Sequence, residues 1–340
     1  MSENTKIEWA DHSWSPWRGC TKVSPGCANC YAETLSKRNP AVLGQWGKGK
    51  PRVLAKNWND PVKWNHRANI PTFTNWDCTD DCGEPAHTYG PRPRVFPSIC
   101  DWLDDEVPIE WLARFLKLLH DTPHLDWLIL TKRPENWLGR ITEALANAEG
   151  IVDRDGWEGD PSTTIGYWLN DWIAGEAPTN VWIGVSVEDQ IRAAERIPIL
   201  LKIPAAVRWL SLEPLLGPVD LTAIKQSPDP GFFGDCLRWY HRGECHKRDK
   251  IPFPTVDWLV IGGESGNGAR PCNVEWVRSL VKQGKEAGVP VFVKQLGANP
   301  HCDCGELPAG GNAEMMHPKG GDPSEWPDDL RVRKFPEVKP

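Results

Sequence analysis

The sequence predicts an α/β fold, a (β/α) barrel that is TIM-like and either partial or complete, from two observations. Short apolar runs alternate with amphipathic helical patterns along most of the 340 residues, which is typical of a parallel sheet with crossover helices. Nearly every apolar run also ends in polar or charged residues. A barrel gathers the carboxyl ends of all its strands at one site, whereas an open doubly wound sheet uses only those near its switch point. The polar strand ends therefore favour the barrel.

The individual elements follow from the length and period of the apolar residues. The runs that predict strands are 94–98, 126–131, 181–186, 207–211, 257–262 and 290–294. The segments with helical spacing are 109–120, 135–148, 190–201 and 274–287. The segment around 14–18 leads into a cysteine-rich loop and is read as the end of a first strand.

Four segments interrupt this alternation. Insertions near 68–93, 150–178 and 226–254 are rich in Gly, Pro and polar residues, and the tail 298–340 is loop-like. We interpret them as decorations of one domain that spans residues 1–340, because 40% hydrophobic residues in a chain of this length suffice for one large core.

Composition also bears on location and partners. No run of about 18 apolar residues is present, so we expect no membrane span. The first ten residues are polar and acidic, unlike a signal or transit peptide, which predicts the cytoplasm, or the host cytoplasm if the gene is phage-borne. The net charge of −7 does not predict nucleic-acid binding.

The charge is unevenly distributed, however. Residues 37–67 hold eight Lys or Arg against one acid, with Trp46, Trp58 and Trp64 among them. Such a stretch could track a phosphate backbone and stack bases. Alternatively, it is a solvated outer face whose tryptophans pack on the barrel.

Three of the eleven cysteines, Cys20, Cys27 and Cys30, follow the spacing C-x6-C-x2-C. In a reducing compartment, clustered cysteines more often hold metals than form disulfides. A [4Fe–4S] cluster with three protein thiolates leaves one iron free for a small molecule. Zinc is the rival, with a fourth ligand such as His12, Cys78 or Cys100. The loop follows the first predicted strand, at the face where barrels do chemistry, and this position favours the cluster.

The remaining cysteines form local pairs that lack a fourth ligand nearby. They predict either a zinc site or second cluster, or free thiols in the insertions. These cysteines are Cys78, Cys82, Cys236, Cys245, Cys302 and Cys304. Cys100 and Cys272 are expected to be ordinary barrel residues.

Several motifs together resemble a known family. They occupy residues 19–33, 130–135, 182–186, 210–215, 262–266, 293–295, 321–326 and 330–333. On these motifs the chain resembles a group of phage and bacterial proteins of uncertain function, grouped as radical S-adenosylmethionine-like proteins with a three-cysteine motif. The resemblance covers almost the whole chain outside the insertions. It implies a partial or complete barrel, a [4Fe–4S] cluster and S-adenosylmethionine, and it implies no particular substrate.

The cysteine loop departs from the usual radical-enzyme pattern, C-x3-C-x2-C with an aromatic residue before the last cysteine. Here the first gap is six residues, Asn29 precedes Cys30, and the aromatic Tyr31 follows it. Contacts to the adenine therefore cannot be transferred from the motif.

If S-adenosylmethionine binds, polar residues at the strand ends are the candidates to hold it. Cationic side chains suit its carboxylate, acidic ones its amine or ribose hydroxyls, and serines add hydrogen bonds. The candidates are Lys132, Arg133, Ser186, Glu188, Ser211, Glu213, Glu264 and Lys294. For each of them, an ion pair that closes the barrel mouth is the alternative.

The leading hypothesis is a radical S-adenosylmethionine enzyme that generates a 5′-deoxyadenosyl radical and modifies or repairs DNA or a nucleotide, with an electron donor as partner. A second is a zinc-stabilised barrel that binds nucleic acid without radical chemistry. A third is an interaction protein, phage-encoded, that uses the barrel as a scaffold.

Overall fold

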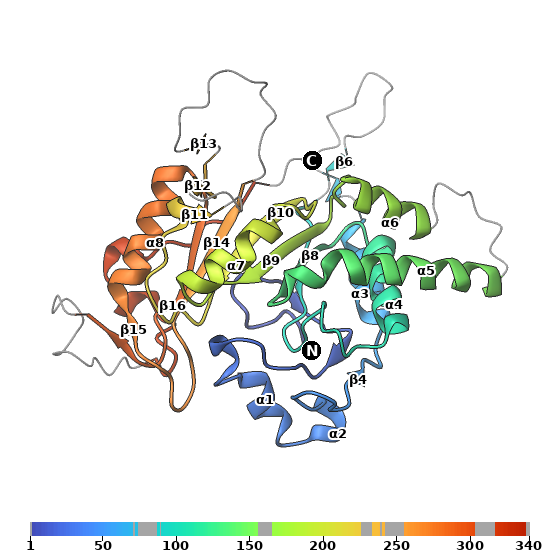
Figure 1. The fold of residues 1–340 in the computed structure, drawn as a ribbon, viewed down its shortest axis with the longest axis horizontal. Helices are drawn as coiled ribbons and strands as arrows, with labels where there is room; N and C mark the ends of the chain where they lie inside the picture. Colours follow the sequence, from blue (N-terminus) through green and yellow to red (C-terminus); the bar gives the residue numbers. More distant parts are fainter. Residues whose placement is uncertain are drawn as a thin grey trace.

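The computed structural model describes residues 2–70, 72–73, 87–88, 90–155, 165–225, 233–238, 240–241, 255–302 and 317–337. Its centre is an eight-stranded sheet in the order β1-β2-β7-β8-β9-β10-β14-β16 (Figure 1). Neighbouring strands are parallel except β1 and β2. The sheet curls into a half barrel. The predicted α/β class and largely parallel sheet are thus confirmed.

The longer strands coincide with the predicted apolar runs to within two residues at each end. The strands of the sheet are β1 (Ser2–Glu3), β2 (His12–Ser13), β7 (Arg94–Phe96), β8 (Asp126–Thr131), β9 (Val181–Ser186), β10 (Val207–Leu212), β14 (Trp258–Gly262) and β16 (Val291–Gln295). Short pairs outside it are β3 (Trp17–Arg18) with β4 (Val53–Leu54), and β15 (Cys272–Asn273) with β17 (Pro300–His301). Two more small sheets join β5 (Thr72–Phe73) with β6 (His87–Thr88), and β11 (Ile224–Lys225), β12 (Phe233–Asp235) and β13 (Tyr240–His241).

Helices follow the strands, and all of them except the first two share one hydrophobic core with the outer face of the sheet. They are α1 (Tyr31–Ser36), α2 (Pro40–Leu43), α3 (Asn59–Ala68), α4 (Ile109–Asp121), α5 (Trp137–Asp155), α6 (Ile165–Ala174), α7 (Gln190–Leu200) and α8 (Val274–Ala287). Helix α6 lies inside the predicted insertion 150–178, and its Leu169 and Trp172 are fully buried. Within the described ranges, none of the helices combines the length and hydropathy of a membrane span.

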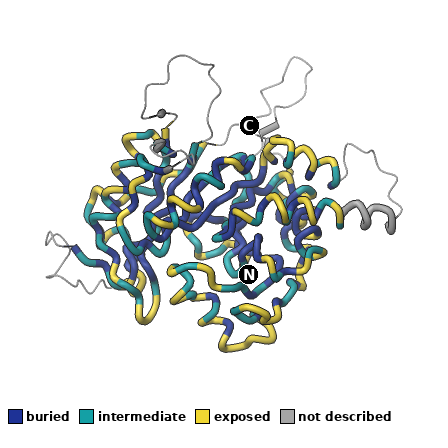
Figure 2. The backbone as a smooth tube through the Cα atoms, in the orientation of Figure 1, coloured by how far each residue is buried: buried dark blue, intermediate teal, exposed yellow. Residues whose placement is uncertain are grey.

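Side chains alternate between the two faces of each strand, and the two faces differ in chemistry. On β9, Val181, Ile183 and Val185 pack into the core beneath the helices, whereas Trp182 belongs to a separate cluster on the inner face. That cluster fills the amino-terminal half of the curl with aromatic rings. Its largest members are Trp9, Phe96, Trp182, Trp209, Trp258 and Phe292, here called the aromatic floor. Figure 2 shows the strands as the most deeply buried part of the chain.

Trp209 is the centre of this floor because a glycine on the next strand leaves room for it. A Cβ atom on Gly184 would lie 2.3 Å from the Trp209 ring. The ring centroid of Trp209 lies 5.3 Å from that of Trp9 and 5.9 Å from that of Trp258. Tilted pairs at such distances stabilise a core beyond the area that they bury.

Segments near both ends of the described chain pack against the aromatic floor at the amino-terminal end of the strands. The carboxylate of Glu8 accepts two hydrogen bonds of 3.0 Å from Arg333. Phe335 packs on Trp258 at a centroid distance of 5.5 Å. The expected loop-like tail is therefore part of the barrel's packing, and its Trp326 and Leu330 are buried in the main core.

Replacing Gly184 with alanine tests the packing of Trp209. We expect Gly184→Ala to lower the free energy of unfolding by about 3 kcal/mol, because the new methyl group overlaps a buried ring. Gly139→Ala is the matched control, since Gly139 lies on α5 with open space around its Cβ position, and it should be neutral or stabilise by up to about 1 kcal/mol. Guanidinium denaturation followed by tryptophan fluorescence measures both; equal stabilities would contradict this account of the floor.

Candidate functional site

Above the aromatic floor, the inner face of the half barrel becomes polar. Lys132 Nζ donates a 2.8 Å hydrogen bond to Ser186 Oγ. Lys294 Nζ lies 2.6 Å from Glu213 Oε1, which also accepts a 3.2 Å hydrogen bond from Gln295. These polar side chains lie at or just beyond the ends of β8, β9, β10 and β16, and we call them the polar layer. They are Lys132, Ser186, Ser211, Glu213 and Lys294.

The cysteine loop lies against the residues that follow these strands, and Glu188 after β9 is its first anchor. Ser24 Oγ donates a 2.5 Å hydrogen bond to the Glu188 carboxylate. Glu188 is fully buried and forms an ion pair of 2.8 Å with Arg196 of α7. A Cβ atom on Gly26 would lie 2.4 Å from the Glu188 side chain, so only glycine lets the loop approach this closely.

Glu264, two residues after β14, is the second anchor. It accepts hydrogen bonds of 2.9 Å from Asn29 Nδ2 and 2.6 Å from Arg270 Nη2. Arg270 Nη1 in turn donates to the Pro25 carbonyl at 2.9 Å. Burial raises the pKa of Glu264, but the hydrogen bonds from Arg270 and Asn29 outweigh it and hold the pKa below its usual value. A carboxylate therefore ties the loop residues around Cys27 and Cys30 to the sheet.

Cys20 lies against a third anchor, Arg133, two residues after β8. The Arg133 Nη atoms lie 3.7 and 3.9 Å from Cys20 Sγ, within reach of hydrogen bonds to sulfur. Arg133 is 3% exposed and forms an ion pair of 2.8 Å with Asp101, which also accepts from Thr131. Burial, together with the nearby charge of Asp101, raises the pKa of the Cys20 thiol to about 12, although Arg133 opposes this rise.

A second buried arginine reaches the residue after Cys20. Arg52 lies 2.9 Å from Asp104 and donates a 2.7 Å hydrogen bond to Thr21 Oγ1. It therefore does not reach solvent as a phosphate ligand would. Trp58 and Trp64 of the same basic stretch are also buried, packed on the barrel.

The described residues contain no group of three or more Cys, His, Asp and Glu side chains arranged to hold one metal ion. His12, considered as a fourth zinc ligand, stacks on Trp64 at a centroid distance of 4.3 Å. Cys236 is a buried free thiol, whereas Cys302 is disulfide-bonded. The other cysteines considered for zinc or a second cluster, Cys78, Cys82, Cys245 and Cys304, lie outside the described residues.

The predicted ligand residues thus divide into two groups. Arg133, Glu188 and Glu264 form buried ion pairs that anchor the cysteine loop, whereas the other five make up the polar layer. Sequence analysis missed the partners that complete the anchors, which are Ser24, Asn29, Asp101, Arg196 and Arg270. Ser24 and Asn29 lie inside the cysteine motif, so their position offered a signal. Nothing in the sequence pairs Asp101 with Arg133.

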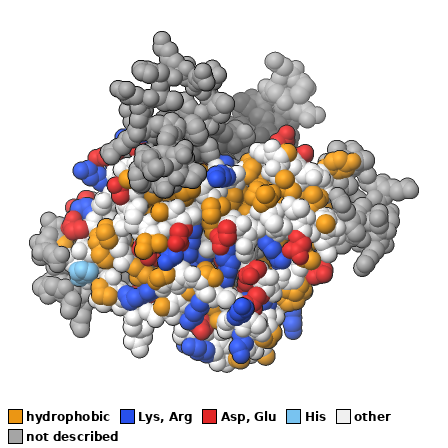
Figure 3. All heavy atoms as spheres, viewed as in Figure 1, with side chains coloured by type: hydrophobic (Ala, Val, Ile, Leu, Met, Phe, Trp, Pro, Cys, Tyr) orange, Lys and Arg blue, Asp and Glu red, His pale blue; other side chains and the backbone are white. Residues whose placement is uncertain are grey.

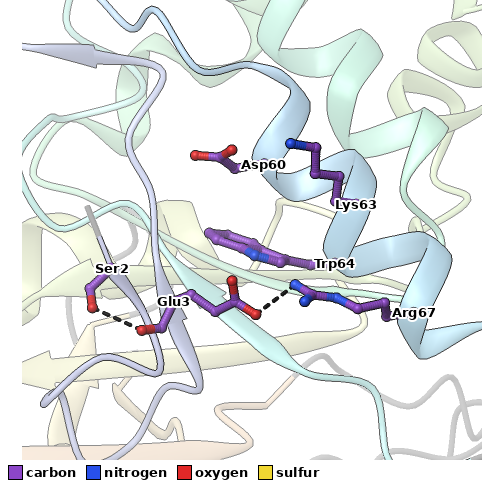
Figure 4. A pocket seen from close by; sticks show the side chains of 6 residues that line it. All are labelled: Ser2, Glu3, Asp60, Lys63, Trp64 and Arg67. Atoms are coloured by element: carbon purple, nitrogen blue, oxygen red, sulfur yellow. Dashed lines mark hydrogen bonds and ion pairs between the residues drawn. The ribbon is translucent and has the colours of Figure 1, made fainter.

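A pocket of about 210 Å³ lies elsewhere, between the edge strand β1 and α3 (Figure 4). Glu3 and Arg67 form an ion pair of 2.6 Å across it. Its lining residues are Ser2, Glu3, Asp60, Lys63, Trp64 and Arg67. None of them belongs to the polar layer or the cysteine loop.

Weakening the second anchor, Glu264 with Arg270, should make two of the three thiols more reactive and leave the third unchanged. Arg270→Ala removes the hydrogen bond to Pro25, so we expect Cys27 and Cys30 to react with iodoacetamide up to about tenfold faster, since one charged hydrogen bond is worth about 1.5 kcal/mol. Cys20 should keep its rate because Arg133 still covers it. Peptide mass spectrometry resolves the three sites, and Arg278→Ala, which breaks an ion pair between α8 and Asp329, is the control. Uniform acceleration of all three thiols would contradict a local anchor.

Comparison with known proteins gives one match. A family described as "Protein of unknown function (DUF5131)" matches residues 4–318. No curated protein and no solved structure matches the chain. The matched range includes the cysteine loop, the polar layer and every strand of the half barrel except β1, which lies just before it. The chain therefore belongs to this family of unknown function.

Proposed function

We propose that the protein is a radical S-adenosylmethionine enzyme whose Cys20, Cys27 and Cys30 hold a [4Fe–4S] cluster. One observation carries the proposal: the three-cysteine loop is fastened across the carboxyl ends of β8, β9 and β14 by Arg133, Glu188 and Glu264. In parallel α/β folds, this end of the sheet is where ligands bind.

The donor set fits such a cluster. Cluster ligands are cysteine thiolates, and N–H donors near the sulfur stabilise their charge. Arg133 supplies such donors to Cys20, and Ser24 Oγ lies 3.7 Å from Cys27 Sγ. The thiolates of a cubane bind different irons, so they stand farther apart than the ligands of one zinc ion. The proposal accordingly rests on the anchoring of the loop and not on a preformed single-ion site.

When bound, the cluster would supply one electron to S-adenosylmethionine, whose cleavage gives the 5′-deoxyadenosyl radical. This chain's own task is to bind and orient the cofactor. Lys132 and Lys294 offer charge to its carboxylate, and Glu213 offers charge to its amine. Ser186 and Ser211 are available for hydrogen bonds, and the aromatic floor excludes water from below. Because Arg133, Glu188 and Glu264 are engaged with the loop, we assign them to positioning the cluster.

The substrate class expected from the sequence was DNA or a nucleotide. What supports it is the set of exposed cations Lys56, Lys63 and Arg67 on and before α3. Of the tryptophans considered for base stacking, Trp58 and Trp64 are engaged in the core, whereas Trp46 is half-buried. We therefore propose the radical chemistry without a committed substrate.

Anaerobic reconstitution with iron and sulfide tests the cluster. We expect the reduced protein to give a [4Fe–4S]⁺ EPR signal that shifts on addition of S-adenosylmethionine and disappears in Cys27→Ala. Near-UV circular dichroism of the variant should match the wild type, which separates loss of the cluster from loss of the fold. Stoichiometric zinc with no iron uptake would favour the zinc-stabilised barrel.

The polar layer is tested by substitution of one of its lysines. Lys294→Ala removes a cation from the mouth, so we expect S-adenosylmethionine to bind about 10- to 100-fold more weakly by calorimetry while iron content stays the same. Lys282→Ala is the control because Lys282 is exposed on α8. Unchanged affinity in Lys294→Ala would contradict the assignment and favour a scaffold role for the barrel.

A further inference from the structure

Exposed apolar side chains lie on the cysteine loop and on the two short helices that follow it. Val23 lies between the first two cysteines and is 44% exposed. Leu35 of α1 is 38% exposed and Val42 of α2 is 50% exposed, and these two short helices pack against each other. Side chains of this kind that gather at one place on a protein surface mark interaction sites. Figure 1 shows α1 and α2 as a small lobe at the edge of the barrel.

Basic side chains surround these apolar residues. Lys22, Lys37 and Arg38 are exposed. Residues 20–50 contain five Lys or Arg and a single acid, Glu33, which pairs with Lys22 at 2.6 Å. The whole chain carries a net charge of −7, so this lobe is a local positive region on an acidic protein. Figure 3 shows several cationic side chains gathered on the lobe.

The composition of this surface suits a protein better than a nucleic acid. Single-stranded nucleic acids are bound by aromatic side chains that stack on bases along a cationic groove. The aliphatic residues Val23, Leu35 and Val42 cannot stack, and Trp58 and Trp64 are buried. Tyr31 of α1 is exposed, but a 2.7 Å hydrogen bond from its hydroxyl to the Ser98 carbonyl holds it against the barrel. An apolar centre with a charged rim is instead the usual anatomy of a protein interface.

We propose that this surface, formed by Lys22, Val23, Leu35, Lys37, Arg38 and Val42 and here called the α1–α2 face, docks a small acidic electron-transfer protein. The inference rests on the proposed cluster, which needs one electron from outside the chain. A donor on this face would lie over the loop that carries the three thiols and leave the polar layer on the inner side free. The donor's reduced cofactor loses one electron and the cluster gains it, with no bond made or broken.

The size and charge of the face agree with a transient partner. Electron-transfer complexes are among the smallest protein interfaces, so a few apolar residues suffice. Opposite charge accelerates such encounters and makes them sensitive to salt. The face therefore provides what a short-lived redox complex requires.

The test uses an acidic flavodoxin as the probe and charge reversal as the perturbation. We expect Lys37→Glu/Arg38→Glu to lower both the affinity for dye-labelled flavodoxin, measured by anisotropy, and the rate of cluster reduction by reduced flavodoxin by about tenfold at low salt. The difference should shrink at 0.5 M salt, where screening is strong. Lys202→Glu/Lys282→Glu, which reverses two exposed lysines on other parts of the barrel, should change neither by more than about twofold. Dithionite, a small reductant, should reduce all variants alike.

Three results discriminate the alternatives. Equal flavodoxin binding by the wild type and Lys37→Glu/Arg38→Glu would overturn the proposal. The proposal would also be overturned if that variant lost binding to a labelled single-stranded oligonucleotide but bound flavodoxin unchanged. The face would then be assigned to nucleic acid. A reconstituted protein that contains neither iron nor acid-labile sulfide holds no cluster, and the proposed function then fails. The anisotropy measurement, which needs no iron, still reports whether an acidic protein docks.

Discussion

The mouth of the half barrel depends on the aromatic floor beneath it. Because Gly184 leaves room for the Trp209 ring, six large aromatic side chains fill the amino-terminal half of the curl. Farther along the same strands, the inner face carries polar side chains such as Ser186, Ser211 and Lys294. The polar layer is thus the upper half of the same alternating pattern that forms the core, and the boundary between the halves follows from packing.

Buried ion pairs determine how the cysteine loop is held. Arg133 with Asp101, Glu188 with Arg196, and Glu264 with Arg270 each include a group that is almost fully buried. Desolvation offsets most of the attraction in such pairs, so they add little net stability. Their effect is to orient the loop. One member of each pair, Arg133, Glu188 or Glu264, also contacts a residue of the cysteine loop. The cysteine loop, which has little regular secondary structure of its own, thereby acquires three fixed points.

The sequence was a good guide to the strands and a poor one to the anchors. The limits of β8 and β9 agree with prediction because both are continuous apolar runs buried on two sides. Helix α6 was missed since its neighbours in sequence are polar and Gly-rich, while its apolar face is short. The candidate residues at the strand ends could be named from position. Which of them face the loop and which face the interior depends on partners such as Arg196 and Asp101, and no periodic pattern encodes such pairs.

The curled sheet has two edge strands, β1 and β16, in the described part of the chain. At the amino-terminal end of the strands, an ion pair between Glu8 and Arg333 connects the chain segments beside these two edges. A closed barrel admits a molecule only along its axis, and that molecule must be small enough to enter whole. In the described part of the chain, the two edge strands of this half barrel are not hydrogen-bonded to each other. A sheet that stays open in this way does not require a ligand to pass through a closed ring of strands.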